Sequence, residues 1–225
     1  MERGVGFSTR AAHWDSAYRT RGANGVSWFE DVPDQSLALL HLLGVDRTTP
    51  VVDVGGGASL LVDHLVAEGF ADVTVLDVSD VALGEGRRRL GAGAPVTWLE
   101  QDLLEWHPAR RYGLWHDRAV LHFLTTDAER ADYLAVLRHA VVPGGAVVIA
   151  TFAEDGPEQC SGLPVVRYSC DELADLLGPQ FTVAATRRQV HTTPAATQQP
   201  FSWVAGRLAD DAGPEVLTLG LGSRR

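Results

Sequence analysis

Three consecutive glycines between an apolar segment and a predicted helix form the part of this sequence best suited to bind a ligand. The apolar segment Val51–Val54 runs directly into Gly55, Gly56 and Gly57, which we name the glycine loop. Glycines let a backbone approach a ligand closely, and the free N–H groups at the start of a helix attract anions. In an open α/β sheet, ligands bind in the crevice at the carboxyl ends of the strands, where this loop is expected to lie.

An aspartate follows the glycine loop at the end of the next apolar segment. Asp77 stands twenty residues after Gly57 and closes the segment Val73–Asp77. A carboxylate in this place accepts hydrogen bonds from both hydroxyls of a ribose, although it could instead cap the helix that begins near Ser79. The dinucleotide fingerprint G-x-G-x-x-G requires a third glycine where the chain has Leu60. The pattern therefore predicts a nucleoside site and disfavours an NAD-dependent oxidoreductase.

A third group of polar residues lies near the end of a later predicted strand, in Trp115–Phe123. His116 and His122 could act as general bases, because an unperturbed imidazole titrates at a pH of about 6.5. Packing within the core is the alternative for both. Arg118 and the more distant Arg167 could clamp a substrate carboxylate, or form ordinary surface ion pairs.

Alternating short apolar and amphipathic segments between Pro50 and Phe152 predict the elements that position these residues. The expected parallel strands are Val51–Val54, Val73–Asp77, Val96–Leu99, Tyr112–Asp117 and Ala146–Phe152. Two further strands, Phe181–Val190 and Phe201–Leu208, are expected to pair with each other. We therefore predict an α/β, Rossmann-like fold: a seven-stranded, mostly parallel sheet with an antiparallel C-terminal hairpin and helices on both faces.

The chain is expected to divide into three parts. Residues 1–48, with helices predicted at Ala11–Arg21 and Leu37–Leu43, form an N-terminal helical lid or cap. Residues 49–208 form the core domain, and residues 209–225 form a tail with little periodicity. The first residues lack the apolar stretch of an export signal, and no run approaches the roughly 20 apolar residues of a membrane span. A soluble, cytoplasmic protein is expected.

Composition excludes several functional classes. The 19 basic and 29 acidic residues give a net charge of −10, which argues against nucleic acid or a membrane surface as a partner. Every basic residue is an arginine, and a chain without lysine cannot be a P-loop protein, a pyridoxal enzyme or a kinase of the usual plan. Two cysteines and scattered histidines provide no disulfide framework and no metal site.

The glycine loop and its neighbours resemble the class I S-adenosylmethionine-dependent methyltransferases. In that family an acidic residue on the first strand precedes the loop, as Asp53 does here, and Ser59 takes the position of the family's third glycine. Asp77 matches the acid that holds the ribose. The resemblance extends from Val51 to about Phe152.

The same resemblance implies the rest of a site for S-adenosylmethionine, the expected cofactor. Asp102, after the third predicted strand, matches the acid that contacts the adenine amino group. Val78 and Leu103, which follow the two acids, are expected to complete the cofactor site.

The N-terminal segment is similar to the lid of small methyltransferases that open with the pattern WD-x-x-Y … WF. By this resemblance Trp14 and Tyr18 close over the methionine end of the cofactor, and Trp28 forms a wall of the acceptor pocket. Aromatic rings attract the cationic sulfonium, whereas the alternative is that they only fasten the lid to the core. Enzymes with this lid include bacterial small-molecule methyltransferases and elongation-factor lysine methyltransferases.

Methyl transfer is an in-line displacement, in which the acceptor lone pair is held about 3 Å from the methyl carbon. A general base is needed only when the acceptor starts protonated. By the resemblance, Asp117 stands where many family members place a residue that orients the acceptor. The expected catalytic residues are Asp117, His116 and His122, and the expected substrate-binding residues are Trp28, Arg118, Cys160 and Arg167. For Cys160, an inert small residue is the alternative.

The function expected from these observations is methyl transfer from S-adenosylmethionine to a small-molecule nucleophile. The first alternative is a protein lysine methyltransferase of the elongation-factor type, and the second is a catalytically inactive nucleoside-binding protein. The acceptor atom and the oligomeric state stay open.

Overall fold

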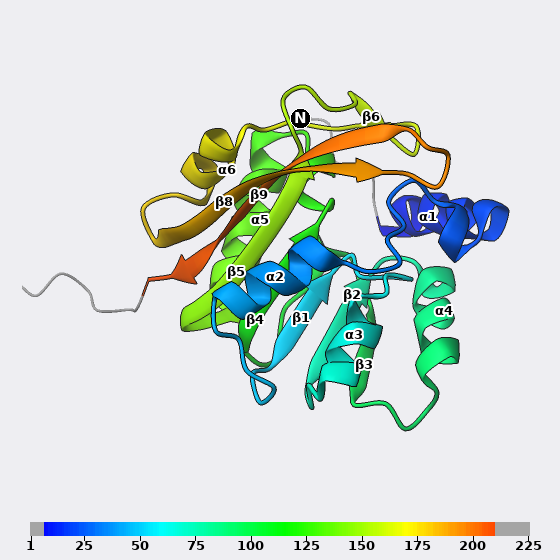
Figure 1. Ribbon diagram of the computed structural model, residues 1–225, viewed down its shortest axis with the longest axis horizontal. Helices are drawn as coiled ribbons and strands as arrows, with labels where there is room; N and C mark the ends of the chain where they lie inside the picture. Colours follow the sequence, from blue (N-terminus) through cyan, green and yellow to red (C-terminus); the bar gives the residue numbers. More distant parts are fainter. Residues whose placement is uncertain (1–6, 210–225) are drawn as a thin grey trace, which may run out of the picture.

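One seven-stranded sheet runs through the centre of the molecule in the computed structural model, which describes residues 7–209 (Figure 1). Its order is β3-β2-β1-β4-β5-β9-β8. The bounds are β1 Val51–Val54, β2 Val73–Asp77, β3 Val96–Glu100, β4 Tyr112–Arg118, β5 Val141–Phe152, β8 Phe181–Thr192 and β9 Gln198–Leu208. The first five strands pair in parallel, and β9 pairs antiparallel with both β5 and β8. This arrangement confirms the predicted sheet.

Six α-helices connect or cover the strands. They are α1 Phe7–Arg21, α2 Asp34–Leu42, α3 Leu61–Glu68, α4 Asp80–Leu90, α5 Asp127–Ala140 and α6 Cys170–Leu177. Short 3₁₀ turns occur at η1 Ala23–Gly25, η2 Leu103–Glu105 and η3 Leu121–Phe123, and a small hairpin joins β6 Gln159–Cys160 to β7 Leu163–Pro164. Capping boxes formed by Thr126 with Glu129 and by Ser169 with Glu172 begin α5 and α6.

The alternation of side chains along each strand separates two core layers. Val51 of β1 and Leu114 of β4 belong to a cluster with residues of α2 and α3. Val52 and Trp115, the next residue in each strand, belong to a second cluster with residues of α5 and α6. Successive strand residues point to opposite faces, and Figure 1 shows α2 and α3 in front of the sheet with α5 behind it. Each polar side chain of β4 therefore points either to the α2 and α3 side of the sheet or to the α5 and α6 side.

Helix α1 lies against α4 (Figure 1) and is fastened to the core at two places. Asp15 accepts hydrogen bonds from the Ser79 hydroxyl at 2.7 Å and the Val81 N–H at 3.3 Å, both at the start of α4. Arg10 forms ion pairs of 2.8 Å with Asp102 and with Glu129. These contacts hold α1 over the carboxyl ends of the strands.

Parts of the predicted lid and tail lie outside the described residues. These parts are residues 1–6 of the lid and all of the tail except Ala209. The division into lid, core and tail stays a prediction. Within residues 7–209, no helix combines the length and the apolar character required to cross a lipid bilayer.

Candidate active site

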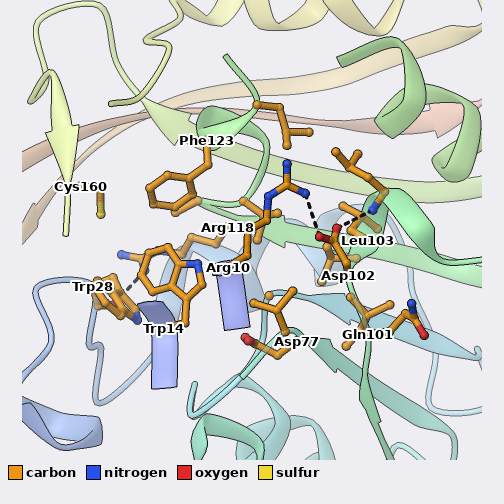
Figure 2. Close-up of a pocket in the computed structure, with 18 of the residues that line it drawn as sticks. Arg10, Trp14, Trp28, Asp77, Gln101, Asp102, Leu103, Arg118, Phe123 and Cys160 are labelled. Atoms are coloured by element: carbon orange, nitrogen blue, oxygen red, sulfur yellow. Dashed lines mark hydrogen bonds and ion pairs between the residues drawn. The ribbon is translucent and has the colours of Figure 1, made fainter. Parts of the chain in front are cut away.

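A cavity of about 140 Å³ lies under α1 at the carboxyl ends of β1, β2 and β4. Figure 2 shows that its side chains form two groups on opposite sides. The acidic side comprises Asp77, Gln101, Asp102 and Leu103, with Arg10 bound to Asp102. The aromatic side comprises Trp14, Trp28, Phe123 and Cys160, together with Phe152 and Phe201 from the same buried cluster as Cys160. Polar acceptors and flat apolar walls thus meet in one cavity.

The glycine loop leaves no room for side chains. Gly55 has a φ of 66°, a conformation that favours glycine, and it lines the cavity. A Cβ atom at Gly56 would stand 2.4 Å from Asp53 Oδ2, and one at Gly57 would stand 2.7 Å from Asp77 Oδ2. The absence of side chains at Gly56 and Gly57 therefore leaves space next to the Asp53 and Asp77 carboxylates. A Cβ atom at either glycine would fill that space.

Asp77 is buried at the end of β2, with one oxygen committed and the other facing the cavity region. Its Oδ1 accepts a 2.8 Å hydrogen bond from the Ser79 N–H, while the Ser79 hydroxyl caps α4 by accepting from the Ala82 N–H. Burial, with a smaller contribution from the nearby carboxylate of Asp53, raises the pKa of the Asp77 carboxyl to about 7. Helix capping therefore falls to Ser79 and leaves Asp77 available for a ligand.

Asp102 faces Asp77 across the acidic side and is oriented by the lid. Its Oδ2 accepts a 2.8 Å hydrogen bond from Arg10, and its Oδ1 accepts one of 3.0 Å from the Leu104 N–H. The sequence predicted Asp102 but not Arg10, since an arginine in an N-terminal helix carries no signal of a partner 92 residues away.

A second, smaller cavity of about 40 Å³ lies between the glycine loop and the segment after α1. A buried chain of hydrogen bonds lines it: Ser36 Oγ lies 2.9 Å from His116 Nε2, and His116 Nδ1 lies 2.7 Å from Asp53 Oδ1. The other Asp53 oxygen, Oδ2, is buried without a partner. A buried carboxylate oxygen in this state calls for a hydrogen-bond donor. This cavity is suited to a cationic or N–H group.

Both ring nitrogens of His116 are engaged in this chain, so the expectation that it acts as a base on an acceptor is not supported by its position. His116 lines the second cavity and not the aromatic side. No sequence pattern predicted Ser36 as a site residue, because it lies on α2, which contacts β4 only in the folded protein.

The structure contradicts the role predicted for Asp117. The Asp117 carboxylate is fully buried on the α5 side of the sheet, where it accepts hydrogen bonds from the Tyr133 hydroxyl at 2.7 Å and from the Val120 and Leu121 N–H groups at 2.8 and 3.1 Å. Burial raises its pKa to about 6. Asp117 does not line the cavity. It holds the turn after β4, where Ala119 has a φ of 76° and does line the cavity.

His122 also differs from its prediction. The ring is fully buried, lies 4.4 Å from the Phe123 ring and 4.7 Å from the Phe152 ring, and does not line the cavity. Its Nδ1 accepts a 3.3 Å hydrogen bond from the Phe152 N–H. Burial and the nearby charge of Arg118 lower its pKa to about 3, so this imidazole is a poor base at neutral pH.

Three of the four predicted substrate-binding residues, Trp28, Arg118 and Cys160, line the first cavity, and Arg167 does not. Trp28 and Cys160 line the aromatic side, and burial raises the pKa of the Cys160 thiol to about 12. Arg167 instead donates to the Gly156 carbonyl at 3.0 Å and to Glu158 at 3.2 Å, outside the cavity. The prediction for Arg167 is wrong because this loop ion pair uses its guanidinium.

Arg118 is the buried cation of the site and lines both cavities. Its Nη1 donates to the Trp28 carbonyl at 2.9 Å, and its Nη2 lies 3.0 Å from Glu30. The guanidinium stands 4.7 Å from the centre of the Phe201 ring. Arg118 therefore separates the aromatic side from the second cavity.

The lid aromatics line the cavity and also fasten the lid. Trp14 lies edge-on to Trp28 at 5.5 Å and to Phe123 at 5.1 Å, and the Tyr18 hydroxyl accepts a 3.1 Å hydrogen bond from Trp28 Nε1. These contacts fasten the N-terminal segment to the core, and the role over the cofactor stays a prediction. Phe152 and Phe201, which sequence reasoning missed, are strand residues whose apolar character indicated only burial.

The predicted cofactor residues gather around the two cavities. Trp14, Tyr18, Gly55, Asp77, Val78, Asp102 and Leu103 line the first, and Asp53 and Gly56 line the second together with Tyr18 and Gly55. Gly57 lines neither of these two and packs behind Asp77.

Comparison with known proteins gives one family and several structures of the same fold. Residues 51–145 match the model of a family described as "Methyltransferase domain". An N-methyltransferase, NodS, from Bradyrhizobium japonicum in complex with S-adenosylhomocysteine is 17% identical, with 86% of this chain and 97% of that chain covered and a TM-score of 0.67. The 1,6-didemethyltoxoflavin-N1-methyltransferase of Burkholderia thailandensis, with its acceptor and S-adenosylhomocysteine bound, is 22% identical, with 93% of each chain covered and a TM-score of 0.67.

A third structure, from work on the conversion of a disulfide bond into a thioacetal group during echinomycin biosynthesis, is 21% identical, with 88% of this chain and 93% of that chain covered and a TM-score of 0.69. No match is found among curated proteins. The matched domain contains β1 to β4, and the cavity lies at the carboxyl ends of three of these strands. Residues 51–145 therefore correspond to a methyltransferase domain, and the fold is shared with methyltransferases that bind S-adenosylhomocysteine.

Proposed function

We propose that this enzyme methylates a small-molecule nucleophile in the cavity under α1. The observation that carries the proposal is that the acidic side and the aromatic side share one cavity under α1. A nucleoside bound on the acidic side would present its reactive group to the aromatic side. The apolar rings there reduce contact with water, which favours methyl transfer.

The residues present fit S-adenosylmethionine, which supplies an electrophilic methyl group on a sulfonium when bound. Asp77 would hold the ribose hydroxyls, and Asp102, already oriented by Arg10, would accept from the adenine amino group. Asp53, whose Oδ2 has no partner, would take the ammonium group of the methionine part. The rings of Trp14 and Trp28 would face the sulfonium.

The packing around the aromatic side favours a small acceptor over a polypeptide. Lysine in a protein chain would need an open groove, whereas here the rings of Trp14, Trp28 and Phe123 pack together beside the cavity. One structure of the same fold, the 1,6-didemethyltoxoflavin-N1-methyltransferase, has the small molecule 1,6-didemethyltoxoflavin bound. The acidic net charge of −10 is the observation that favours the alternative, a basic protein substrate.

Calorimetric titration with S-adenosylhomocysteine tests the cofactor site. We expect binding to the wild-type protein and a loss of about 1–3 kcal/mol in Asp77→Ala, because the ribose loses its hydrogen-bond acceptors. The control is Asp72→Ala, which removes a half-exposed carboxylate from the other end of β2. Equal affinity in Asp77→Ala and wild type would contradict the assignment of the acidic side.

Transfer from labelled S-adenosylmethionine tests the acceptor class. Incubation with a cell extract followed by separation by size should place the label in the low-mass fraction. Label confined to a large polypeptide would contradict the small-molecule proposal and favour the protein substrate.

A further inference from the structure

The aromatic side of the cavity contains a single charged side chain. Of the charged residues that line this cavity, Arg10, Asp77 and Asp102 belong to the acidic side, and only Arg118 stands among the rings. Its side chain is 11% exposed, so it is largely removed from bulk water. A buried charge is costly unless groups of opposite charge or hydrogen-bond acceptors surround it.

The protein itself satisfies Arg118 only in part. Nη1 donates to the Trp28 carbonyl, but Nε has no hydrogen-bond partner. Nη2 forms an ion pair with Glu30 at 3.0 Å whose geometry is not that of a hydrogen bond, and Glu30 is shared with His191 at 3.5 Å. Unpaired guanidinium N–H groups in a dry site gain most from an anionic acceptor, because charge-assisted hydrogen bonds are the strong ones.

The aromatic side offers no group that can remove a proton from an acceptor. Burial raises the pKa of Tyr18 and raises that of Cys160 to about 12, so both are protonated at neutral pH. His116 lines the second cavity and His122 lies behind Phe123 and Phe152. An acceptor that needs deprotonation therefore has to lose its proton before it reaches this space.

We propose that the acceptor is a flat aromatic or heteroaromatic molecule that binds as an anion, its charge paired with Arg118 and its ring packed against Trp28 and Phe123. The inference rests on the proposed function and names its substrate class. An acidic phenol, enol, thiol or ring N–H has this chemistry. The acceptor lone pair forms the bond to the methyl carbon, and the electron pair of the carbon–sulfur bond passes to sulfur. Anion and sulfonium become neutral together, and no proton has to leave.

A chromophoric probe tests this directly in the complex with S-adenosylhomocysteine. The probe is 4-nitrophenol, whose phenol and phenolate absorb at different wavelengths, and the neutral match is 4-nitroanisole. We expect the apparent pKa of bound 4-nitrophenol to fall by about one unit or more, which corresponds to a tenfold or greater preference for the anion. An unchanged or raised pKa, equal binding of phenolate and ether, or no binding of either would overturn the inference.

Variants assign the preference to Arg118. Arg118→Met should abolish the anion preference, and the double variant Glu30→Gln/Arg118→Met should do the same without leaving Glu30 unpaired. Arg167→Met removes a loop arginine outside the cavity and should behave as wild type. The measurement on the wild-type protein decides the question even if the Arg118 variants fail to fold.

One result would assign Arg118 differently. If Arg118→Met weakens S-adenosylhomocysteine tenfold or more and keeps the preference for the phenolate, Arg118 serves the carboxylate of the donor and the inference is wrong. Separate titration with S-adenosylhomocysteine distinguishes a failure of the proposed function from a failure of the proposed acceptor class. A wild-type protein that does not bind it contradicts the proposed function, whereas one that binds it but shows no anion preference contradicts only the acceptor class.

Discussion

At the scale of single residues, the pleat of β4 decides which polar side chains can act. His116 and Asp117 are neighbours in sequence, yet His116 meets Asp53 on the α2 side while Asp117 meets Tyr133 on the α5 side. Alternation along a strand separates them. Arg118, two residues after His116, returns to the α2 side and reaches the cavity. His116 and Arg118 therefore serve the cavities on one face of the sheet, while Asp117 serves the core on the other.

Asp117→Asn should lower stability more than it affects the ligand. The carboxylate accepts three hydrogen bonds, and an amide offers one oxygen and places N–H groups against buried donors. We expect the free energy of unfolding in urea to fall by about 1–3 kcal/mol, with a smaller loss in Tyr133→Phe. The affinity of the folded protein for S-adenosylhomocysteine should stay within a few-fold. Wild-type stability with turnover reduced a hundredfold would instead restore Asp117 as an acceptor-orienting residue.

Local sequence signals identify only those site residues that belong to a pattern. The glycine loop, Asp77 and Asp102 stand at strand ends in a recognisable order, and all but Gly57 line one of the two cavities. Ser36 and Glu30 enter the site through contacts with β4 across the fold, which no local pattern encodes. The exclusion of Arg167 from the cavity likewise depends on a loop carbonyl and a nearby glutamate.

At the scale of elements, α1 is held over the cavity by charge at one end and by rings along its length. Arg10 bridges Asp102 and Glu129, while Trp14 packs edge-on against Phe123. If α1 acts as the predicted lid, we expect it to move when a ligand leaves. The ion pairs of Arg10 are broken in that motion, so they oppose release.

Arg10→Met should therefore speed the release of S-adenosylhomocysteine. Hydrogen bonds to charged groups contribute about 1.5–3 kcal/mol, and partial exposure of Arg10 reduces this, so we expect roughly a tenfold faster dissociation. Stopped-flow tryptophan fluorescence follows it through Trp14 and Trp28. The matched control is Arg19→Met, which breaks an exposed pair with Asp15 on the same helix. Equal rates in Arg10→Met and wild type would show that the rings alone hold the lid.

The strands could be predicted closely, but their ends could not. The sequence predicts a strand from Ala146, whereas β5 begins at Val141 and passes through Pro143–Gly145, residues typical of a turn. The register between β4 and β5 shifts between Tyr112 and Leu114, and this irregularity lets β5 continue. Tertiary pairing thus overrides the local signal. The same holds for the short β6–β7 hairpin, which lies in a segment predicted only as a loop.

At the scale of the whole molecule, two buried acids make stability depend on pH in an unusual direction. Asp77 and Asp117 have pKa values raised by burial from the ordinary 3.8 to about 7 and about 6. Between the ordinary pKa of 3.8 and the raised values, these two carboxyls are protonated in the folded protein and ionised in the unfolded chain. The contribution of these protons to the stability of the fold is fully present below a pH of about 4 and is lost as the pH rises through 6 to 7.

Urea unfolding of the ligand-free protein between about pH 5 and pH 8 measures this effect. We expect the free energy of unfolding to decline with rising pH, by at most about 1.4 kcal/mol per pH unit for each acid that titrates. Asp77→Asn should flatten the slope between about pH 6 and 7. Glu30, whose pKa is lowered by His191 and Arg118 despite its burial, acts only below its ordinary value of 4.5. A stability that rises through this range would contradict the assignment.

The left-handed backbone at Ala119 restricts how this enzyme can acquire a new specificity. Branched and bulky side chains are poorly tolerated at a φ of 76°, so this position of the wall can exchange alanine for little besides glycine, asparagine or aspartate. Diversification, whether by natural drift or by directed evolution, is then directed to Phe123, which is only partly buried and whose backbone imposes no such restriction. A mutagenesis library that randomises Phe123 and spares position 119 and the buried Phe152 and Phe201 would sample new acceptors with few misfolded members.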